Sequence, residues 1–579
     1  MSTDLVIRNG LVVDGTGGPS RRCDVAIEGD RIVAVGDDVA RGRREIDADG
    51  LLVTPGFIDP HTHYDGQATW DPWLAPSSHH GVTTVAMGNC GVGFAPVAAN
   101  FHDELIEMME GVEDIPGTAL HEGLRWDWES FPDYFDALER QERTIDVATH
   151  VPHAALRAFV MGERGGDPLE QPNEKELVEM ARLLGEGLDA GALGVSTSRT
   201  ERHRTSRGEN LGTLRARAPE LQALASELRT KGRGVFQLVS DCYRTADDEF
   251  AASEFSLIAD IARTSQRPVS YTVQQDFEAP ERWRDLMELA TSMQIEGLDV
   301  KAQVAPRPIG VLLGLEASNN VFTPVRAYAR IAALPLAERI VALQNSELRQ
   351  KILESHAALT GPDAFAGHAF FGRFDEMFVL DEPVNYDLDV SKSLGATARR
   401  IGVDAREYAY DVQLQRDGHQ LIYTPLFNFV NGNLDAVHEM ITNPVSMFGL
   451  SDGGAHCGAI CDASMTTSYL TLWARERTDE MSIPLETVVQ QLTRRPATHF
   501  GWFDRGLVAP GLLADLNIID FAGLNCASPR IVTDLPAGGR RLLQSATGYR
   551  YTIKAGSVTF EDGAATGLLP GKLLRGAQE

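Results

Sequence analysis

The sequence contains a His-Thr-His triplet, with His61 and His63 directly after an apolar run at residues 51–53. The run predicts a short buried strand that ends at the triplet. Because side chains alternate along a strand, His61 and His63 should point to the same side. Their Cα atoms would lie about 6–7 Å apart, a spacing at which two imidazoles can bind one metal ion. The triplet therefore favours metal-dependent chemistry over the alternative of two structural histidines.

Two further residues have types that suit a metal centre. Asp452 ends an apolar-led segment and precedes two glycines, which leaves its carboxylate exposed. It is either a turn aspartate or a metal-bound carboxylate that also takes a proton from water, as a catalytic base. Cys90 follows another strand-like run and is either a small buried hydrophobe or a thiolate ligand. Beside the histidine pair, the ligand interpretation of Cys90 is favoured.

The middle of the chain, residues 56–500, alternates strand-like runs with helical patterns. The strand-like runs are residues 82–87, 147–151, 192–196, 234–239, 269–273 and 300–304, and the helical patterns include 174–188 and 219–230. Repeated β-then-α units predict a TIM-like (β/α)8 barrel of the α/β class. A doubly wound sheet is the alternative, but no Gly-x-Gly-x-x-Gly motif opens a helix after a strand. If residues 51–58 are the first barrel strand, His61 and His63 lie at the end where barrel active sites form.

Both chain ends are rich in strand-like runs. Residues 1–55 include two apolar runs around Asn9-Gly10, a pattern typical of a hairpin. Residues 501–579 contain similar runs. Two β-rich ends that flank a different middle predict one small β-sandwich domain built from both ends. A stretch at about 310–420 fits the barrel rhythm poorly and predicts a helical insertion.

Composition limits the class of protein and its partners. The 579 residues are 43% hydrophobic and 23% charged, which is typical of a globular protein of one large domain and a satellite. The net charge of −29 argues against nucleic acid or an anionic membrane as a partner. Six scattered cysteines without a CxxC pair indicate a reducing cytoplasm. We see no signal peptide and no apolar stretch of the roughly 18–20 residues that span a membrane.

Taken together, these motifs resemble the amidohydrolase superfamily, in the branch of the D-aminoacylases (N-acyl-D-amino-acid deacylases). The motifs are Thr-Pro-Gly-Phe-Ile-Asp-Pro-His-Thr-His at 54–63, Gly-Asn-Cys-Gly at 88–91, Gly-Ala-Leu-Gly at 191–194 followed by Ser196-Thr197, Ser-Asp-Gly-Gly-Ala-His at 451–456, and Pro-Gly-Leu-Leu-Ala-Asp at 510–515. The resemblance implies a metal-bearing barrel, a β-sandwich formed by both termini, and hydrolysis of a C–N bond, commonly with zinc. It also implies that His61, His63 and Asp452 share one metal site. Cys90 would be its bridging thiolate, and His153 would face the substrate.

The sequence departs from this family where a second metal would bind. The family has a histidine on each of the fifth and sixth strands, whereas this chain has Gln237 and Tyr271 in those strands and no histidine. Neither residue is a good zinc ligand at neutral pH, so we assign both to substrate binding. The lysine and tyrosine that D-aminoacylases direct at their substrate are also missing. We therefore expect one metal ion per chain, zinc first, with iron or another divalent metal as the alternative.

A basic loop at 197–213 follows the fourth predicted strand and holds four arginines in an acidic protein. It is either a solvated loop that forms salt bridges, or Arg199 or His203 binds a substrate carboxylate at the barrel mouth. His456, four residues after Asp452, is a further candidate for substrate binding. The expected partner is a small molecule that carries a carboxylate, and a homo-oligomer is compatible with the sequence.

The first functional hypothesis is a metal-dependent amidohydrolase that cleaves a non-peptide amide bond of an N-acyl amino acid or a related amide. Asp452 would be its general base and later its general acid. A metal-assisted lyase or C–C bond-cleaving enzyme is the alternative, since the missing histidines could accompany changed chemistry. A non-catalytic relic is disfavoured, because it would have no need for His61, His63 and Asp452 together.

Overall fold

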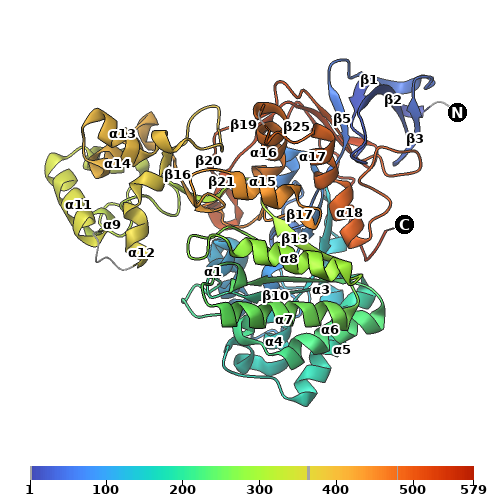
Figure 1. Ribbon diagram of the computed structural model, residues 1–579, viewed down its shortest axis with the longest axis horizontal. Helices are drawn as coiled ribbons and strands as arrows, with labels where there is room; N and C mark the ends of the chain where they lie inside the picture. Colours follow the sequence, from blue (N-terminus) through green and yellow to red (C-terminus); the bar gives the residue numbers. More distant parts are fainter. Residues whose placement is uncertain (1–2, 361–365, 479, 579) are drawn as a thin grey trace.

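The computed structural model describes residues 3–360, 366–478 and 480–578. Residues 1–2, 361–365, 479 and 579 lie outside the described chain. They include small parts of the predicted terminal β-domain and of the predicted insertion. The central feature is a ring of parallel strands with helices around it (Figure 1). Within the described residues, the ring runs through β6 (Phe57–Asp59), β7 (Val82–Met87), β8 (Asp146–Thr149) with β9 (Val151–Pro152), β10 (Gly194–Arg199), β11 (Val235–Ser240), β12 (Val269–Thr272), β13 (Val300–Val304) and β17 (Ser446–Phe448).

Two junctions turn these strands into a barrel. β8 and β9 act as one strand, because β8 pairs with β7 and β9 pairs with β10. The first and last strands meet just beyond their carboxyl ends, where Thr62 forms a parallel bridge with Gly453. There the His63 N–H donates to the Gly453 carbonyl at 2.8 Å, and the Asp452 N–H donates to the His61 carbonyl at 3.1 Å. The predicted (β/α)8 architecture is thereby confirmed.

Amphipathic helices cover the outside of the ring. They include α5 (Glu174–Ala190), α6 (Ala218–Lys231), α7 (Asp248–Ser265) and α8 (Arg282–Ile295). In α6 the buried residues Leu221, Leu224 and Leu228 recur at helical spacing. Asn173 caps the start of α5 in a capping box. These local signals explain why the sequence predicts this half of the barrel well.

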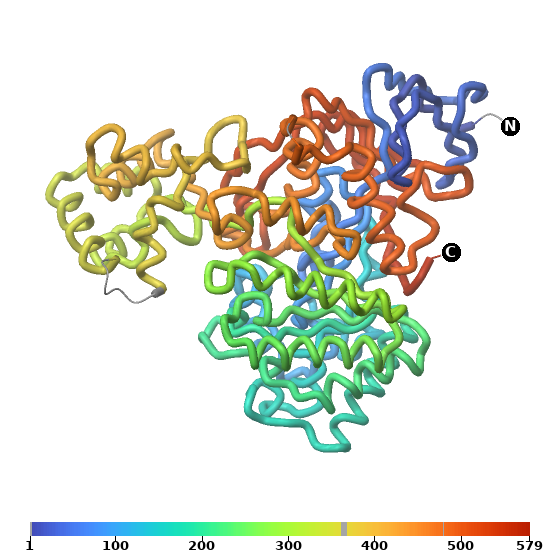
Figure 2. The backbone as a smooth tube through the Cα atoms, in the orientation of Figure 1, coloured from blue at the N-terminus to red at the C-terminus, as the bar shows by residue number. Residues whose placement is uncertain are grey.

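The two chain ends form a second domain, a nine-stranded sheet within the described residues. Its N-terminal strands are β1 (Thr3–Val12), β2 (Arg21–Glu28), β3 (Arg31–Gly36), β4 (Gly42–Asp47) and β5 (Leu52–Pro55), and its C-terminal strands are β18 (Leu516–Ile519), β23 (Tyr549–Lys554), β24 (Ser557–Glu561) and β25 (Ala564–Ala565). Antiparallel pairing of β5 with β18 joins the two halves. Val25, Val53 and Ile518 belong to its apolar core. Figure 2 shows both termini on the side of the molecule where this sheet lies.

Two local predictions near the N-terminus are wrong. Asn9-Gly10 does not form a hairpin turn, because β1 continues through it. Asn9 instead has a φ of 61° and lies in an irregularity of the pairing with β2, as in a β-bulge. Residues 51–58 are not one barrel strand either, since β5 pairs in the terminal sheet and β6 in the barrel. Gly56 separates them, and a Cβ there would lie 2.3 Å from Thr83 Oγ1.

Residues 309–427 form a lobe that projects to the left in Figure 1. Its helices are α9 (Arg326–Ala329), α10 (Leu336–Leu343), α11 (Ser346–Leu359), α12 (Ala366–Ala369), α13 (Leu394–Ile401) and α14 (Ala405–Gln413). Three short antiparallel strands, β14 (Ile309–Leu313), β15 (Phe378–Val379) and β16 (Ile422–Phe427), connect it to the barrel. The lobe has an apolar core of its own, which includes Phe322, Ile352 and Tyr410.

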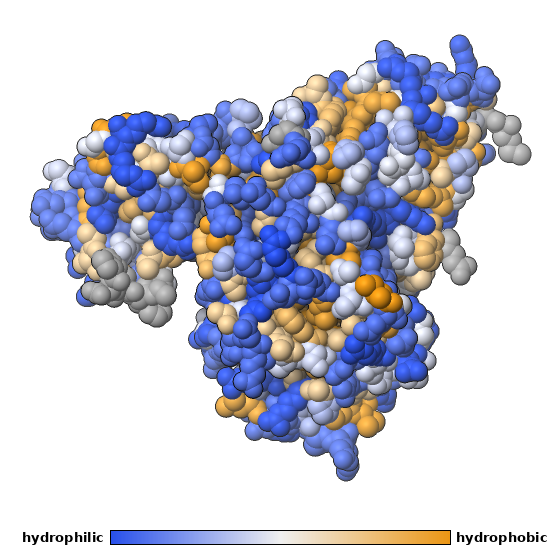
Figure 3. All heavy atoms as spheres, in the orientation of Figure 1, coloured by the Kyte–Doolittle hydropathy of each residue, from blue (hydrophilic) through white to orange (hydrophobic). Residues whose placement is uncertain are grey.

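The final residues leave the terminal sheet and run along the barrel. The Gly571 N–H donates to the Arg143 carbonyl at 2.8 Å, and the Leu574 N–H donates to the Val147 carbonyl at 2.8 Å. Leu574 also joins an apolar cluster with Ile58 and Ala148 of the barrel strands. The outer face in Figure 3 is largely hydrophilic, as the charge of −29 leads one to expect. In the described part of the chain, no helix is long and apolar enough to span a membrane.

Candidate functional site

The closure of the barrel places Asp452 between the two histidines of the triplet. Asp452 has a φ of 47°, and Gly454, at 93°, has a backbone conformation that favours glycine. A Cβ on Gly453 would lie 2.5 Å from the Ser77 hydroxyl oxygen, so this close approach also requires glycine. As a result, Asp452 Oδ1 lies 3.5 Å from His61 Nε2 and 3.7 Å from His63 Nε2. The Asp-Gly-Gly sequence is therefore the local reason for the geometry.

Cys90 completes a compact donor group. It follows β7, and its Sγ lies 3.3 Å from His61 Nε2. Among the described residues, His61, His63 and Cys90 place their ligand atoms within 4.8 Å of one another. All three side chains are buried. The structure thus brings together the four residues that the sequence predicts as metal ligands.

Both histidines are oriented so that Nε2 faces Asp452. His61 Nδ1 lies 2.6 Å from Gln303 Oε1, so the Nδ1–H donates to this oxygen. His63 Nδ1 lies 3.2 Å from Glu113 Oε1, and Glu113 is buried at the end of α1 (His102–Glu113). The Gln303 contact fixes the tautomer of His61, as such partners do for metal-binding histidines. His63 and Glu113 form a close ion pair without hydrogen-bond geometry. Sequence reasoning missed both: Gln303 is a polar residue within an apolar strand pattern, whereas Glu113 has no signal in its helix.

Burial and charge set the protonation of this group. Burial raises the pKa of Cys90 to about 12, raises that of Glu113, and lowers the pKa of His61 to about 4. Burial would also raise the pKa of Asp452, but the neighbouring His63 and His61 hold it well below its usual range. An ionised carboxylate, two imidazoles and a thiol that becomes a thiolate on binding are the donors that zinc-like ions prefer. The residues present therefore fit a divalent metal ion.

The strands that carry the family's further histidines hold amide and hydroxyl groups here. Gln237 Oε1 accepts the Cys90 N–H at 3.1 Å. Gln303 Nε2 donates to Ser270 Oγ at 3.0 Å. Gln237, which we predict to bind substrate, therefore supports the Cys90 backbone and is not among the residues that line the cavity.

A cavity of about 200 Å³ opens above the donor group. Its walls combine apolar side chains with a few polar ones: Val112, Val239, Tyr243, Ile309, Leu426, Phe427, Leu450 and Ile460 with Glu113, Thr200, Arg202, His203, Thr272, Gln274 and His456. The predicted residues His203 and His456 are among them. Arg202, which the sequence did not single out, is the arginine of the basic loop that lines the cavity. Its guanidinium lies 5.0 Å from the centre of the Phe427 ring and 3.2 Å from Asp276.

Arg199 does not reach this cavity, contrary to our prediction. Its guanidinium forms hydrogen bonds of 2.6 and 2.8 Å to Glu254 in α7. Another of its N–H groups donates to the Ala216 carbonyl at 2.5 Å. Arg199 is thus held by the helix layer on the outside of the barrel.

His153 and Tyr271, which we predict to contact substrate, are not among the residues that line the cavity. His153, at the start of α4 (His153–Met161), lies 2.8 Å from Thr197 Oγ1 and 2.9 Å from Glu220 Oε1 of α6. The Tyr271 hydroxyl donates to the Leu286 carbonyl of α8 at 2.6 Å. The polar atoms of both side chains are thus satisfied by Thr197 of β10 and by the helices α6 and α8.

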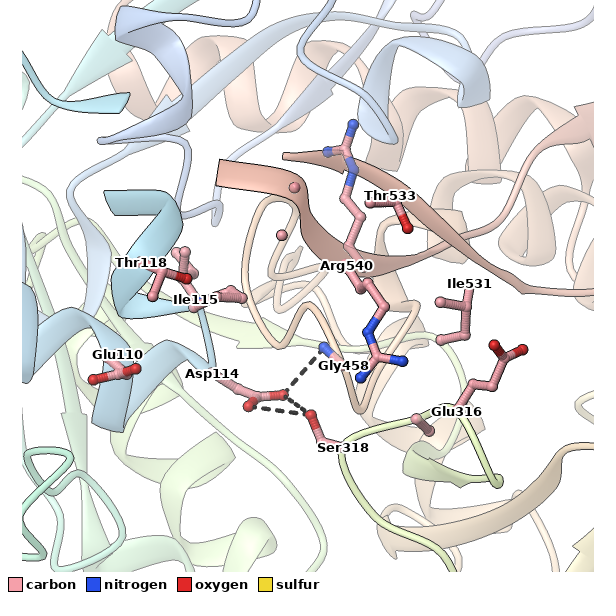
Figure 4. A pocket seen from close by; sticks show the side chains of 15 residues that line it. Glu110, Asp114, Ile115, Thr118, Glu316, Ser318, Gly458, Ile531, Thr533 and Arg540 are labelled. Carbon is pink, nitrogen blue, oxygen red and sulfur yellow. Dashed lines mark hydrogen bonds between the residues drawn. The ribbon is translucent and has the colours of Figure 1, made fainter. Parts of the chain in front are cut away.

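A larger cavity of about 410 Å³ lies between α1, the insertion lobe and the hairpin of β20 (Arg530–Leu535) and β21 (Gly539–Leu543). Figure 4 shows Asp114 accepting hydrogen bonds from the Gly458 N–H at 3.2 Å and the Ser318 hydroxyl. The four donor residues do not line this cavity. Its hydrogen bonds link the segment after β17 to the lobe, which supports the segment that carries Asp452 and His456.

Residues 44–560 match the profile of the Amidohydrolase family. The chain belongs to this family. This amidohydrolase is 43% identical over 199 residues to the N-acyl-D-glutamate deacylase of Alcaligenes xylosoxydans xylosoxydans. That segment covers 34% of this chain and 37% of the relative's length. This chain is also 29% identical over 542 residues to an uncharacterised protein of Mycobacterium tuberculosis. The match covers 89% of this chain and 84% of that protein.

Solved structures of amidohydrolases share the complete fold. A D-aminoacylase superposes with a TM-score of 0.65 at 24% identity, over 99% of this chain and 100% of the other. The N-acyl-D-glutamate deacylase from Bordetella bronchiseptica, complexed with zinc and a phosphonate inhibitor, has a TM-score of 0.63 at 24% identity, over the same shares of the two chains. These likenesses confirm the fold, a barrel with a terminal β-domain. The family match and the identity to the deacylase confirm the predicted resemblance.

Proposed function

We propose that this amidohydrolase cleaves the amide bond of a small N-acyl amino acid, or of a related amide, with one divalent metal ion per chain. The observation that carries the proposal is the buried group of His61, His63, Cys90 and Asp452 below a cavity of about 200 Å³. The names of the related deacylases support the same reaction class. Zinc is the proposed metal, because the donor set combines nitrogen, sulfur and carboxylate oxygen.

The donor group assigns a role to each ligand residue. His61 and His63 would bind the ion through Nε2, Asp452 through Oδ1 and Cys90 through Sγ. A divalent ion held by these residues would supply Lewis acidity, with which an amide carbonyl is polarised and water becomes more acidic. Gln303 orients His61 through a hydrogen bond, and the Glu113 carboxylate lies beside His63 as an ion-pair partner.

Asp452 is the proposed proton carrier. Its side chain is about one-fifth exposed and lines the cavity, whereas the two histidines behind it are buried. As an ionised carboxylate it accepts a proton from the attacking water and then donates this proton to the departing amide nitrogen. His456 Nε2 lies 4.0 Å from Asp452 Oδ2, within reach of the same substrate.

Arg202 is the proposed recognition residue for a substrate carboxylate. Among the described residues that line the cavity, Arg202 is the one basic residue of the lysine or arginine type. Its contacts with Phe427 and Asp276 fix its position. A guanidinium can bind a carboxylate through two parallel hydrogen bonds. The apolar wall formed by residues such as Val239 and Leu426 would accept an acyl chain or an apolar side chain.

Metal analysis and a substrate screen test the proposal. We expect close to one zinc per chain, which is lost in His61→Ala, and amine release from N-acyl amino acids of one hand. Asp452→Asn should lower kcat by about 100-fold or more. Arg202→Met should raise KM for carboxylate substrates, whereas Arg207→Met, in the same loop but paired with Glu107, should not. A protein without bound metal, or products of C–C cleavage alone, would contradict hydrolysis.

A further inference from the structure

A third cavity lies at the opposite end of the barrel from Asp452 and is lined mainly by polar and charged residues. It has a volume of about 330 Å³ and is lined by residues where β13 and β17 begin and by the helix α18 (Arg494–Phe500). Figure 1 labels these three elements. Barrel active sites form at the carboxyl ends of the strands, so this cavity is remote from Asp452 and takes no part in the proposed hydrolysis. Its lining is Asp299, Lys301, Pro444, Ser446, Met447, Gln490, Arg494, Arg495, Thr498 and His499.

His499 is a buried polar group without a partner in this cavity. The residue is only 2% exposed, and neither ring nitrogen makes a hydrogen bond. The nearest carboxylate, Asp299, lies 4.0 Å from Nδ1, which is too far for a hydrogen bond. Burial lowers the pKa of His499 to about 4, so the ring is neutral near pH 7 and carries one N–H donor. An unpaired buried donor is costly unless a ligand or water satisfies it.

Positive charge gathers around this histidine in a strongly acidic protein. Among the lining residues, Lys301, Arg494 and Arg495 oppose the single carboxylate of Asp299, although the chain as a whole carries −29. No ion pair in the described chain neutralises either arginine. The Arg495 guanidinium is held in place by one hydrogen bond of 2.9 Å to the Ser446 carbonyl. Arg494, Arg495, Thr498 and His499 lie on one face of α18, because residues four apart are neighbours on a helix.

We propose that this cavity is a binding site for a compact oxyanion of the phosphate class, either inorganic phosphate or the phosphate group of a small metabolite. The anion would accept hydrogen bonds from the His499 ring and from the two arginines. It would satisfy the unpaired ring donor and offset the charge of Arg494 and Arg495, whereas Lys301 is already paired with Asp299 at 3.6 Å. Arginine suits this role because its planar donor fork matches phosphate oxygens.

Calorimetric titration of the metal-loaded full chain with inorganic phosphate, at constant ionic strength, tests the proposal. We expect saturable binding that weakens about tenfold or more in Arg495→Met and in His499→Leu, since each loses a hydrogen bond to a charged ligand. Arg229→Met, an exposed arginine on α6, is the matched control and should bind phosphate as the wild type does. Acetate should bind more weakly than phosphate, and a phosphorylated sugar at least as well if the natural ligand is a metabolite.

Two further readouts separate a ligand site from a purely structural cluster. Without phosphate, His499→Leu should be as thermally stable as the wild type, because it removes an unpaired polar group. With phosphate, only the wild type and Arg229→Met should gain stability. A crystal soaked in tungstate should show the anion beside α18. The proposal is overturned if tungstate occupies only the cavity above Asp452, or if Arg495→Met and His499→Leu bind phosphate normally.

Discussion

At the scale of single residues, the candidate metal centre depends on side chains that hold other side chains. His61 can present Nε2 to Asp452 only because Gln303 accepts its Nδ1–H at 2.6 Å. Gln303 is fixed in turn by its hydrogen bond to Ser270. The amide of Gln303 thus performs the orienting task that a carboxylate or a backbone carbonyl performs in other metal sites.

Replacing Gln303 should therefore weaken metal binding although Gln303 touches no metal. Gln303→Leu should lower zinc affinity by about 10–100-fold, while Gln303→Glu, which keeps an acceptor oxygen, should restore most of it. Competition with a chromogenic chelator measures both. Gln413→Leu is the control, because Gln413 is equally buried but lies in the insertion lobe. Unchanged affinity in Gln303→Leu would show that His61 is oriented by other contacts.

Within the basic loop, residue type alone did not identify the side chain that lines the cavity. The sequence predicts that either Arg199 or His203 binds a substrate carboxylate. In the structure His203 lines the cavity, whereas Arg199 forms an ion pair with Glu254. Arg202 takes the position beside the cavity instead. A loop has no regular period, so the direction of each side chain is decided by the partners it meets in the folded chain.

At the scale of elements, a buried ionic cluster connects α4 to α6. Glu220 of α6 binds the Arg157 guanidinium at 2.6 and 2.7 Å and lies 2.9 Å from His153 Nε2. Burial would raise the pKa of Glu220, but His153 and Arg157 lower it, so the carboxylate stays ionised. All three side chains are buried, and the cluster has no contact with the cavity above Asp452.

Removing the carboxylate should destabilise the barrel without changing substrate recognition. Glu220→Ala leaves the Arg157 cation buried and unpaired, which should cost about 3–5 kcal/mol of unfolding free energy. Glu179→Ala, which breaks an exposed pair with Arg182, should cost at most about 1 kcal/mol. Urea unfolding followed by tryptophan fluorescence compares the two.

The same cluster tests our revised view of His153. His153→Gln should lower stability but leave KM for the best N-acyl substrate within about twofold, because the side chain faces α6. Steady-state kinetics at a temperature where the variant is folded provides the measurement. A large rise in KM with unchanged stability would return His153 to the substrate site that the family resemblance implies.

At the scale of the whole molecule, one buried ion network joins the barrel to the terminal sheet. Asp146 of β8 lies 2.8 Å from Lys554 Nζ of β23 and 2.6 Å from Arg505 Nη1. Lys554 also binds Asp515 at 2.8 Å. Residues from the C-terminal part of the chain and a residue of the barrel therefore meet in one place, which ties the terminal sheet to the barrel.

This network predicts how stability depends on pH. Burial would raise the pKa of Asp146, but Lys554 and Arg505 lower it below its ordinary value. A carboxylate with a depressed pKa contributes stability that is complete above its unfolded pKa of about 3.9 and is lost as pH falls towards the folded value. Asp146→Asn should therefore be less stable than the wild type at pH 5–8, and the difference should shrink below about pH 4.

Thermal unfolding between pH 3 and pH 8 measures this difference. Asp49→Asn, which removes an exposed partner of Arg22, is the control and should change the midpoint little at any pH. A difference between Asp146→Asn and wild type that stays constant down to pH 3 would mean that Asp146 remains ionised throughout, or that another group controls acid unfolding.

The sequence by itself determined the donor types and the order of the elements. His61, His63, Cys90 and Asp452 are marked by strand ends and by glycines, and these signals are local. The β-then-α rhythm likewise predicts the barrel, because hydrophobic period is a property of each segment alone. The tight Asp-Gly-Gly turn even contains the reason why Asp452 can approach His63.

Only the tertiary structure decided which other polar residues face the barrel interior. Glu113 and Gln303 meet the histidines from elements far away in sequence, and Tyr271 turns to a helix although it lies on a barrel strand. The physical reason is that successive side chains of a strand point to opposite faces of the sheet, so the sequence fixes only which residues share a face. Which neighbour stands on each side depends on the pairing of strands around the ring and on its closure between Thr62 and Gly453.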